Sequence, residues 1–436
     1  MNRYERYKDS GIPWLGEVPE HWDVKRLKFL GDIILGLTYS PENITNEDNG
    51  TLVLRSSNIQ NGKLVFEDNV FVNSDIPQKM ITTEQDILIC SRNGSRSLIG
   101  KCALIEKYGL NQTFGAFMTV YRTPYRKFVY YALNSEIFKS QLGLFLTSTI
   151  NQLTTQVLGN FNIAFPPRDE QTAIAHYLDT KLGEIDALID KQQTLLEKLA
   201  EQRTAVITHA VTKGLNPAAP MKNSGVEWLG DVPAHWDVSP FKLVMNSIID
   251  YRGKTPEKTN SGVFLITARN IKNGIIDYTL SQEFIDEDNY EEVMRRGLPK
   301  LGQVLMTTEA PLGEVAQIDR TDVALAQRVL KFDGKKDKLD NRFLKYFILS
   351  KAFQASLYKF ATGSTALGIK SERLSYLKSL LPPVTEQINI ANYLDQETVK
   401  IDRLCETVNQ TIGRLKEYRT ALITQAVTGK IKVTDE

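Results

Sequence analysis

Arginine, asparagine and lysine side chains gather in a glycine-containing stretch, SRNGSRSLIGK, at residues 91–101, directly after an apolar run. Its polar members include Arg92, Asn93, Arg96 and Lys101. Arginine and asparagine can form paired hydrogen bonds with guanine and adenine edges in the DNA major groove. Glycine lets a backbone approach a ligand closely. The stretch therefore indicates binding chemistry rather than bond-breaking chemistry.

Three further stretches carry comparable side chains: RSSNIQNG, its counterpart ARNIKNG, and TTEAPLGE, which stands where the second half should match residues 91–101. Glutamate can accept a hydrogen bond from cytosine N4, so the last stretch allows a different base preference. Any one of these residues could be an ordinary solvated loop residue, but the set recurs at corresponding places in both halves. Polar loops at residues 147–156 and 362–370 add hydrogen-bonding groups. The added candidates for DNA contact are Arg55, Asn58, Arg269, Asn270, Lys272, Thr308 and Glu309.

The sequence contains no recognisable catalytic or metal-binding motif. GSRSLIGKC has five residues between its glycines and a cysteine after its lysine, whereas a phosphate loop needs four residues and a serine or threonine. FPPR and LPPV lack the polar and aromatic residues that flank the prolines of amino-methyltransferases. The cysteines (Cys90, Cys102 and Cys405) are scattered, and with four histidines they are too sparse for a zinc site. We predict no catalytic residue and no metal in this chain.

The elements that must position these residues come in two copies. WLGEVPEHWDV at residues 14–24 returns as WLGDVPAHWDV at residues 228–238, and these phrases hold all four tryptophans. Because the phrase hardly changes between halves that differ elsewhere, we expect it to clamp the start of each half by burying tryptophan. Between the repeats, short apolar or β-branched runs predict strands. Single helices are expected at residues 126–142 and 341–360.

Each half ends in a heptad pattern that follows a proline pair, Pro166–Pro167 or Pro382–Pro383. The pattern predicts two coiled-coil helices of about 40 residues, roughly 60 Å long, with Gly214 and Gly429 near their ends. Antiparallel packing is the simplest arrangement, and Arg203 and Arg419 at equivalent seam positions could fix its register; alternatively, each helix packs on its own domain. The candidate coiled-coil and partner-docking positions are Leu178, Leu182, Ile185, Ile189, Leu196, Leu199, Leu394, Ile401, Val408, Ile412 and Leu415.

Composition sets broad limits on the class of protein. The chain has 436 residues, which calls for two or more domains, and its net charge is +1. A surface for a polyanion must therefore come from local clustering. Three cysteines suit a reducing cytoplasm, and no apolar run reaches the length of a membrane span. We therefore expect a cytoplasmic protein.

The repeated phrases resemble those of the specificity subunits of type I restriction–modification systems. The matching pieces are the WLGxVPxHWDV entries, the PPxxEQxxIAxYLD openings at Pro166 and Pro382, and the helix ends EQRTAVITHAVTKG and EYRTALITQAVTGK. The resemblance covers essentially the whole chain. It implies an α+β fold with two pseudo-repeated, strand-rich α/β recognition domains separated by two long antiparallel coiled-coil helices. The expected ranges are 1–165, 166–215, 216–380 and 381–436.

The resemblance also implies a function. Each recognition domain would read one half of a bipartite double-stranded DNA site, and the helices would set the spacer between the half-sites. The subunit would be non-catalytic and would dock two methyltransferase subunits and the restriction (motor) subunits. S-adenosylmethionine, ATP and magnesium would be bound only by those partners.

Two other readings of the sequence stay open. The chain could be a two-domain coiled-coil interaction scaffold that does not bind DNA sequence-specifically. It could also be an enzyme whose site matches no familiar motif. Salt-dependent binding to a bipartite duplex separates the first reading from the specificity subunit.

Overall fold

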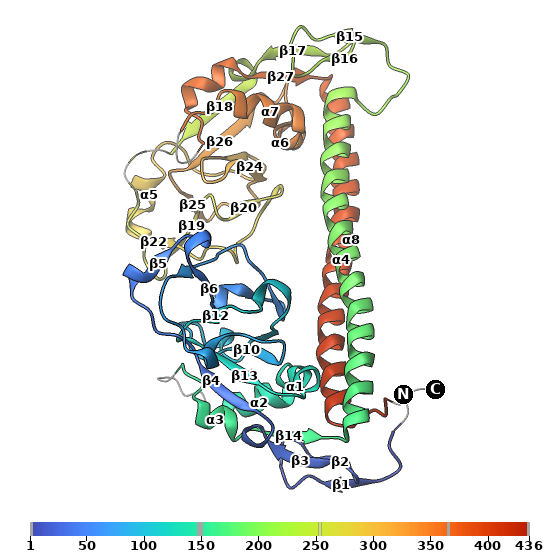
Figure 1. Ribbon diagram of the computed structural model, residues 1–436. Coiled ribbons are helices and arrows are strands. Elements are labelled where there is room, and N and C mark those ends of the chain that lie inside the picture. The colour runs from blue at the N-terminus through green and yellow to red at the C-terminus, as the bar shows by residue number, and fades with distance from the viewer. Residues whose placement is uncertain (1–2, 146–150, 252, 254, 364–366, 434–436) are drawn as a thin grey trace. The chain divides into compact units, whose positions relative to one another are not determined.

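The structure is a computed structural model that describes residues 3–145, 151–251, 253, 255–363 and 367–433 (Figure 1). The chain forms two compact units. Unit 1 consists of residues 1–192 together with 410–436, and unit 2 consists of residues 193–409. The boundary passes through both long helices, so each unit holds one strand-rich domain and half of each helix.

The domain of unit 1 is built on two small sheets. An antiparallel sheet has the order β11-β10-β13-β4, and a mixed sheet has the order β12-β6-β9-β5, in which β12 runs parallel to β6. Strand β10, DILIC, is buried at every position, as expected for a short apolar strand covered on both faces. The strands are β4 (Asp32–Leu35), β5 (Ile44–Thr45), β6 (Thr51–Leu54), β9 (Phe71–Val72), β10 (Asp86–Cys90), β11 (Cys102–Leu104), β12 (Thr113–Phe114) and β13 (Met118–Arg122).

Unit 2 repeats this plan except for the strand β5, in whose place there is only an isolated antiparallel bridge between Thr259 and Phe284. Its antiparallel sheet has the order β18-β26-β23-β24, and its mixed sheet has the order β22-β19-β25, with β19 and β25 parallel. The repeat seen in the sequence therefore extends through the variable regions, where few residues match. The strands are β18 (Met245–Asp250), β19 (Val263–Ile266), β22 (Phe284–Ile285), β23 (Val304–Thr308), β24 (Leu312–Gln317), β25 (Val323–Leu325) and β26 (Val329–Gly334).

Short strand pairs complete each domain, and they also correspond. In unit 1 they are β1 (Tyr7–Asp9) with β2 (Glu17–Pro19), β3 (Asp23–Arg26) with β14 (Asn162–Phe165), and β7 (Ile59–Gln60) with β8 (Lys63–Leu64). In unit 2 they are β15 (Met221–Asn223) with β16 (Asp231–Pro233), β17 (Asp237–Pro240) with β27 (Lys378–Leu381), and β20 (Ile271–Lys272) with β21 (Ile275–Ile276). Two short helices, α3 (Thr155–Gly159) and α5 (Tyr290–Val293), have no counterpart of the same kind.

The single helix expected at the end of each domain is two helices, so this expectation was wrong. Unit 1 has α1 (Arg126–Leu133) and α2 (Glu136–Phe145), and unit 2 has α6 (Asn341–Leu349) and α7 (Lys351–Lys359). A serine causes each break, because its hydroxyl accepts the backbone N–H three residues on and donates to the carbonyl three residues back. Ser135 does so with Phe138 and Ala132, and Ser350 with Phe353 and Phe347.

The second tryptophan of each repeated phrase is buried as expected, whereas the first is not, since Trp14 is 36% exposed and Trp228 is half-buried. In unit 1, Trp22 is fully buried and contacts Gly429, which has a positive φ just beyond the second long helix. In unit 2, Trp236 is fully buried and packs in the same way near Gly214, just beyond the first. Each phrase thus holds the end of the helix that belongs to the other half of the sequence, which explains why the phrase and the helix end are both repeated.

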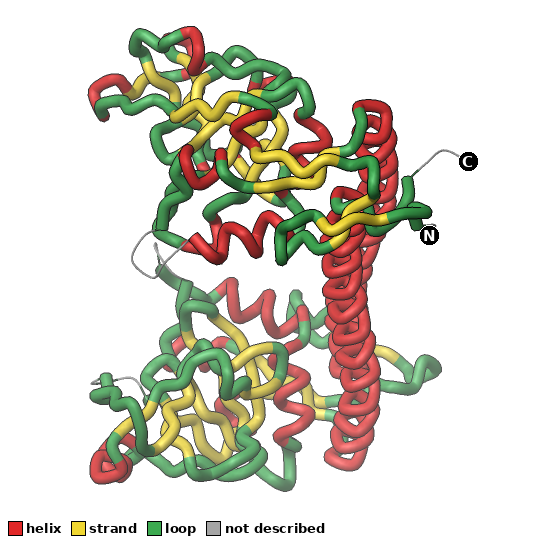
Figure 2. Tube along the Cα trace, turned by 90° about the horizontal axis from the view of Figure 1, so that it is seen from below, coloured by secondary structure: helices red, strands yellow, loops and turns green. Residues whose placement is uncertain are grey.

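The two long helices are α4 (Arg168–Lys213) and α8 (Val384–Val427), and each begins directly after its proline pair (Figures 1 and 2). They pair antiparallel within each unit. The described heptad positions are buried or half-buried. In unit 1, Arg419 of α8 lies 3.1 Å from Asp186 of α4. In unit 2, Arg203 of α4 lies 3.5 Å from Asp402 of α8. The two ion pairs use equivalent positions, so both units keep one register.

Each domain is fixed to the helices by corresponding contacts. The Tyr131 hydroxyl donates to Asp179 in unit 1, and the Tyr346 hydroxyl donates to Asp395 in unit 2. Hydroxyl groups near the helix ends accept backbone N–H groups of α2 and α7 in the same way: Thr424 from Glu136 and Thr208 from Lys351. Among the described residues, no helix is long and apolar enough to cross a membrane.

Candidate nucleic-acid interface

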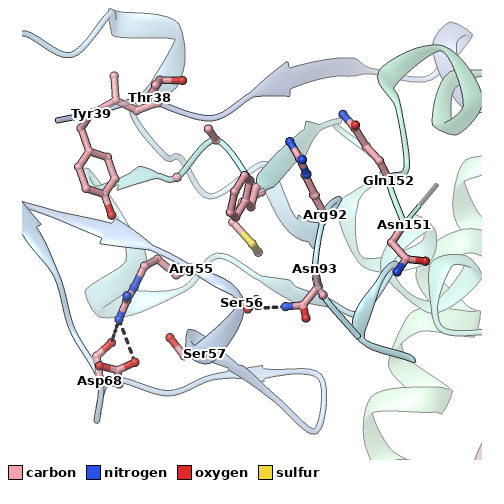
Figure 3. Close-up of a pocket in the computed structure, with 16 residues that line it drawn as sticks. Thr38, Tyr39, Arg55, Ser56, Ser57, Asp68, Arg92, Asn93, Asn151 and Gln152 are labelled. Atoms are coloured by element: carbon pink, nitrogen blue, oxygen red, sulfur yellow. Dashed lines mark hydrogen bonds and ion pairs between the residues drawn. The ribbon is translucent and has the colours of Figure 1, made fainter. Parts of the chain in front are cut away.

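A cavity of about 1180 Å³ opens between the two sheets of unit 1, and we call it the N-terminal groove. Tyr39, Arg55 and Asp68 lie on one side, and Arg92, Asn93, Asn151 and Gln152 lie on the other (Figure 3). The lining is rich in amide, hydroxyl and guanidinium groups. Its lining residues are Leu37, Thr38, Tyr39, Arg55, Ser56, Ser57, Asp68, Arg92, Asn93, Gly94, Gly115, Ala116, Phe117, Met118, Asn151 and Gln152.

The polar side chains of the N-terminal groove differ in how firmly they are held. Arg55 is bound to Asp68, with its Nη2 donating to Oδ2 at 2.8 Å and to the backbone carbonyl at 3.1 Å. Asn93 donates to the Ser56 hydroxyl at 3.1 Å. The exposed Arg92 guanidinium lies over the Phe117 ring, 5.2 Å from its centroid. Stacking on an aromatic face leaves the hydrogen-bonding edges of a guanidinium open to a ligand.

Unit 2 has a smaller cavity of about 250 Å³ at the corresponding place, which we call the C-terminal groove. Its charged members are arranged differently. Lys258 lies 2.7 Å from Glu283, and Arg328 lies 2.8 Å from Glu309. The groove is lined by Thr255, Pro256, Lys258, Leu265, Thr267, Ala268, Arg269, Glu283, Ala310, Ala326, Gln327 and Arg328.

Backbone hydrogen bonds prove that the two grooves are equivalent. The N–H of Ser91 donates to the Phe117 carbonyl, and the N–H of Thr308 donates to the Arg328 carbonyl, both at 3.0 Å. The next residues, Arg92 and Glu309, each form an isolated antiparallel bridge, to Gln152 and Gly368 respectively. Arg92 therefore corresponds to Glu309, and Phe117 corresponds to Arg328. The two grooves share this backbone pairing, and the side chains at the paired positions differ.

Several sequence candidates do line or border the grooves. Arg55, Arg92 and Asn93 line the N-terminal groove, and Arg269 lines the C-terminal groove. Glu309 borders the C-terminal groove through its ion pair with Arg328. Arg96 and Lys272 are exposed but do not line either cavity.

Four candidates are corrected by the structure, because their polar groups serve the fold. Asn58 and Asn270 are fully buried at equivalent turns. Each accepts the backbone N–H three residues back, at 2.9 Å, and donates to the carbonyl seven residues on. The Lys101 ammonium donates to the Ser56 and Ile59 carbonyls, and Thr308 is buried. Asparagine closes such turns as readily as it reads adenine, so the sequence pattern alone misassigned them.

Sequence reasoning missed Tyr39, Phe117, Lys258 and Arg328, although all of them line or contact the grooves. Phe117 and Arg328 come just before the strands β13 and β26. Strands β13 and β26 occupy corresponding places in the two halves of the sequence. That correspondence was the available signal for the residues that precede them. Of the two polar loops, Asn151 and Gln152 line the N-terminal groove, while residues 147–150 and 364–366 lie outside the described residues.

Among the described residues, no group of three or more histidine, cysteine, aspartate or glutamate side chains could hold a metal ion. Burial raises the pKa of the Cys90 thiol, and it raises the pKa of the Cys102 thiol to about 12. A thiol with a raised pKa stays protonated near neutral pH and is a weak nucleophile.

Comparison with protein families gives a match over both halves of the chain. The model described as "Type I restriction modification DNA specificity domain" matches residues 19–198 and again residues 233–414. Together these ranges contain both grooves and most of both long helices.

Individual relatives are distant but match over nearly the whole length. The chain is 24% identical to the EcoKI type I restriction enzyme specificity subunit of Escherichia coli K12, covering 95% of this chain and 90% of that protein. It is 26% identical to the MjaVIII specificity subunit of Methanocaldococcus jannaschii, covering 95% and 94%.

Two solved structures share the fold. One, from a study of complex assembly and conformational transition of the type I R-M system, has a TM-score of 0.66 at 16% identity and covers 95% of this chain and 99% of that chain. The HsdS subunit from Thermoanaerobacter tengcongensis has a TM-score of 0.51 at 16% identity, covering 95% and 98%.

Proposed function

The chain belongs to the type I restriction modification DNA specificity family, as a specificity subunit with two target recognition domains, and we propose that each domain reads one half of a bipartite DNA site. The N-terminal groove would contact one half-site and the C-terminal groove the other. The long helices would set the unread spacer between them. The subunit itself would be non-catalytic.

The observation that carries this proposal is the pair of equivalent grooves with different side chains. A repeated backbone frame supports a shared task, such as seating a duplex of constant shape. Side chains that change at equivalent positions, above all Arg92 and Glu309, support reading of two different sequences. Guanidinium, amide and hydroxyl groups are the groups that read base edges and contact phosphates.

The long helices support the role of spacer. Helix α4 has 46 residues and α8 has 44, which at 1.5 Å per residue gives roughly 65–70 Å. Half-sites on one face of B-DNA are separated by about 34 Å per turn. A helix pair of this length can therefore connect two domains that contact DNA one turn or more apart.

Partner subunits would supply the chemistry of the complex. We propose that two methyltransferase subunits, which carry S-adenosylmethionine, and the restriction subunits, which use ATP and magnesium, assemble on this chain. The net charge of +1 suits this arrangement, because partners can add phosphate contacts to those that this chain makes.

Selection from a random duplex library tests the proposal. The complex of this chain with its methyltransferase subunits should enrich duplexes with two fixed segments at a fixed separation. The methyltransferase subunits without this chain serve as the control and should enrich no common sequence. Binding by the complex should also weaken steeply with salt. Enrichment of no sequence, with binding indifferent to salt, would favour an interaction scaffold instead.

A further inference from the structure

Each groove has one arginine at a pair of equivalent positions, but the arginine stands at the first position in unit 1 and at the second position in unit 2. In unit 1 the first position, two residues after β10, holds Arg92, and the second position, directly before β13, holds Phe117. In unit 2 the first position holds Glu309 and the second holds Arg328. Each groove thus has one guanidinium at this pair of positions. In unit 1 it follows β10, and in unit 2 it precedes β26, the counterpart of β13.

The two guanidinium groups are supported by different neighbours. Arg92 lies on the ring of Phe117, which is 58% exposed, and no described carboxylate lies within 4.0 Å of its nitrogen atoms. The Arg328 guanidinium forms an ion pair with Glu309, with Nε 2.8 Å from the carboxylate. The first arrangement supports the flat face of the guanidinium, and the second holds one of its edges.

Both arrangements leave guanidinium N–H groups available to donate hydrogen bonds to a base. A guanidinium whose face is stacked keeps all its N–H edges, and one whose Nε is engaged keeps the two terminal nitrogens as a fork. Either fork matches the O6 and N7 acceptors of guanine, the commonest specific contact of arginine in the major groove. The Glu309 carboxylate is already engaged with Arg328, which argues against its use as an acceptor for cytosine N4.

We propose that Arg92 and Arg328 are the specificity-determining residues for one guanine in each half-site, and that Glu309 is a positioning residue that orients Arg328. This inference rests on the proposed function, because it needs the grooves to contact DNA. It goes further by assigning the base class and the residue responsible in each domain.

The test uses the full chain in complex with its methyltransferase subunits and measures methylation rates on duplexes with each base pair of the target replaced in turn. Arg92→Ala should lower the discrimination at one G·C pair of one half-site, and Arg328→Ala should do so at one G·C pair of the other. The expected loss is roughly 10- to 100-fold in each case. Lysine in place of either arginine should not restore discrimination, because lysine lacks the planar fork.

Glu309→Gln tests whether the Glu309 carboxylate orients Arg328. It should weaken discrimination at the same base pair as Arg328→Ala, by less, and leave the other half-site unchanged. Arg320→Ala is the matched control, because Arg320 also has a carboxylate partner, Asp322, and an aromatic neighbour, Tyr278, but does not line either groove. This control should leave both half-sites unchanged.

The outcomes separate the inference from the proposed function. A wild-type complex that methylates without sequence preference would overturn the proposed function and this inference with it. A wild-type complex with a bipartite target whose discrimination survives Arg92→Ala and Arg328→Ala would overturn the inference alone. Loss at an A·T pair, or equal loss in both half-sites from one substitution, would also overturn it.

Discussion

The domains of units 1 and 2 share a frame and differ in the groove that the frame holds. Repeated polar residues, such as the buried asparagines Asn58 and Asn270, make the same hydrogen bonds to backbone in both domains. The residues at the groove positions after β10 and β23, Arg92 and Glu309, have opposite charge on the same backbone. Polar residues common to both halves, such as these asparagines, therefore serve the fold, whereas those that differ are the candidates for recognition.

In each unit the repeated tryptophan phrase meets the start of one long helix and the end of the other, and we call this place the junction. The two junctions are not fully alike. In unit 1, Glu170 accepts hydrogen bonds from the Tyr4 hydroxyl at 2.7 Å and from the Trp22 indole at 3.1 Å, and it lies 2.5 Å from the His21 ring. In unit 2, Glu386 lies 2.8 Å from His235, but the buried indole N–H of Trp236 has no hydrogen-bond partner. Packing is therefore common to both junctions, and the indole hydrogen bond is not.

The largest expected effect tests whether both junctions depend on buried tryptophan. Trp22→Ala and Trp236→Ala should each lower the free energy of unfolding by about 3–5 kcal/mol, because each side chain is fully buried. Denaturant titration measures this loss. Trp14→Ala is the control, since Trp14 is 36% exposed and should cost far less. A cost for only one of the buried tryptophans would break the equivalence of the junctions.

A second comparison concerns the buried turn asparagines. Asn58→Ala and Asn270→Ala should each cost about 2–3 kcal/mol of folding stability, because backbone groups inside each domain lose their partners. Ser57→Ala, at the neighbouring half-buried position, should cost little. Thermal unfolding of the three variants checks this. If the asparagine variants were as stable as the wild type but bound DNA poorly, the structural assignment of these residues would be wrong.

A third comparison uses Lys331, which is buried on β26 where the equivalent position of β13 is the apolar Val120. Burial lowers the Lys331 pKa from 10.5 to about 8, with a smaller contribution from Lys300. When the pH lies between these two pKa values, Lys331 is protonated in the unfolded chain and deprotonated in the folded chain. The free energy of unfolding should therefore rise with pH. The rise should be about 1 kcal/mol between pH 7.5 and 9.

Lys331→Met should remove that rise, whatever its effect on stability at a single pH. Val120→Met provides the control and should leave the slope of stability against pH unchanged. Denaturant midpoints of wild type and both variants across this range give the answer. An unaltered slope in Lys331→Met would show that the lysine does not titrate there.

The smallest expected effect concerns the two ion pairs between the long helices. Arg203→Ala and Arg419→Ala should each cost about 0.5–1 kcal/mol, because the Asp402 and Asp186 partners are partly exposed. Double-mutant cycles with those aspartates should give equal coupling energies in the two units. Coupling in one unit and none in the other would mean that the register is set on one side only.

Much of the fold could be predicted from the sequence, because it depends on long or repeated patterns. The heptads, the proline pairs and the terminal glycines locate α4 and α8, and the tryptophan phrase marks each junction. The breaks at Ser135 and Ser350 were missed, since serine fits a helix interior and a helix cap alike. The arginines at the heptad seam pair with aspartates of the opposite helix, which the sequence pattern did not identify.

The site was predicted less completely, for a physical reason. Residues of one loop, such as Arg92 and Asn93, can be found from local composition. Partners that reach the groove from distant strands, such as Tyr39, Phe117 and Arg328, are brought there only by sheet pairing. Local sequence also does not distinguish an asparagine that closes a turn from one that faces a ligand.

The central claim is that the two domains select separate half-sites and the helices set their separation. Its most direct test is the methylated motif in cells that carry this chain with its methyltransferase subunits, compared with cells whose chain lacks one heptad from each helix, residues 191–197 and 408–414. A heptad is about 10.5 Å long, so the spacer should shorten by about three base pairs while both half-sites stay the same. Altered half-sites with an unchanged spacer would contradict the account.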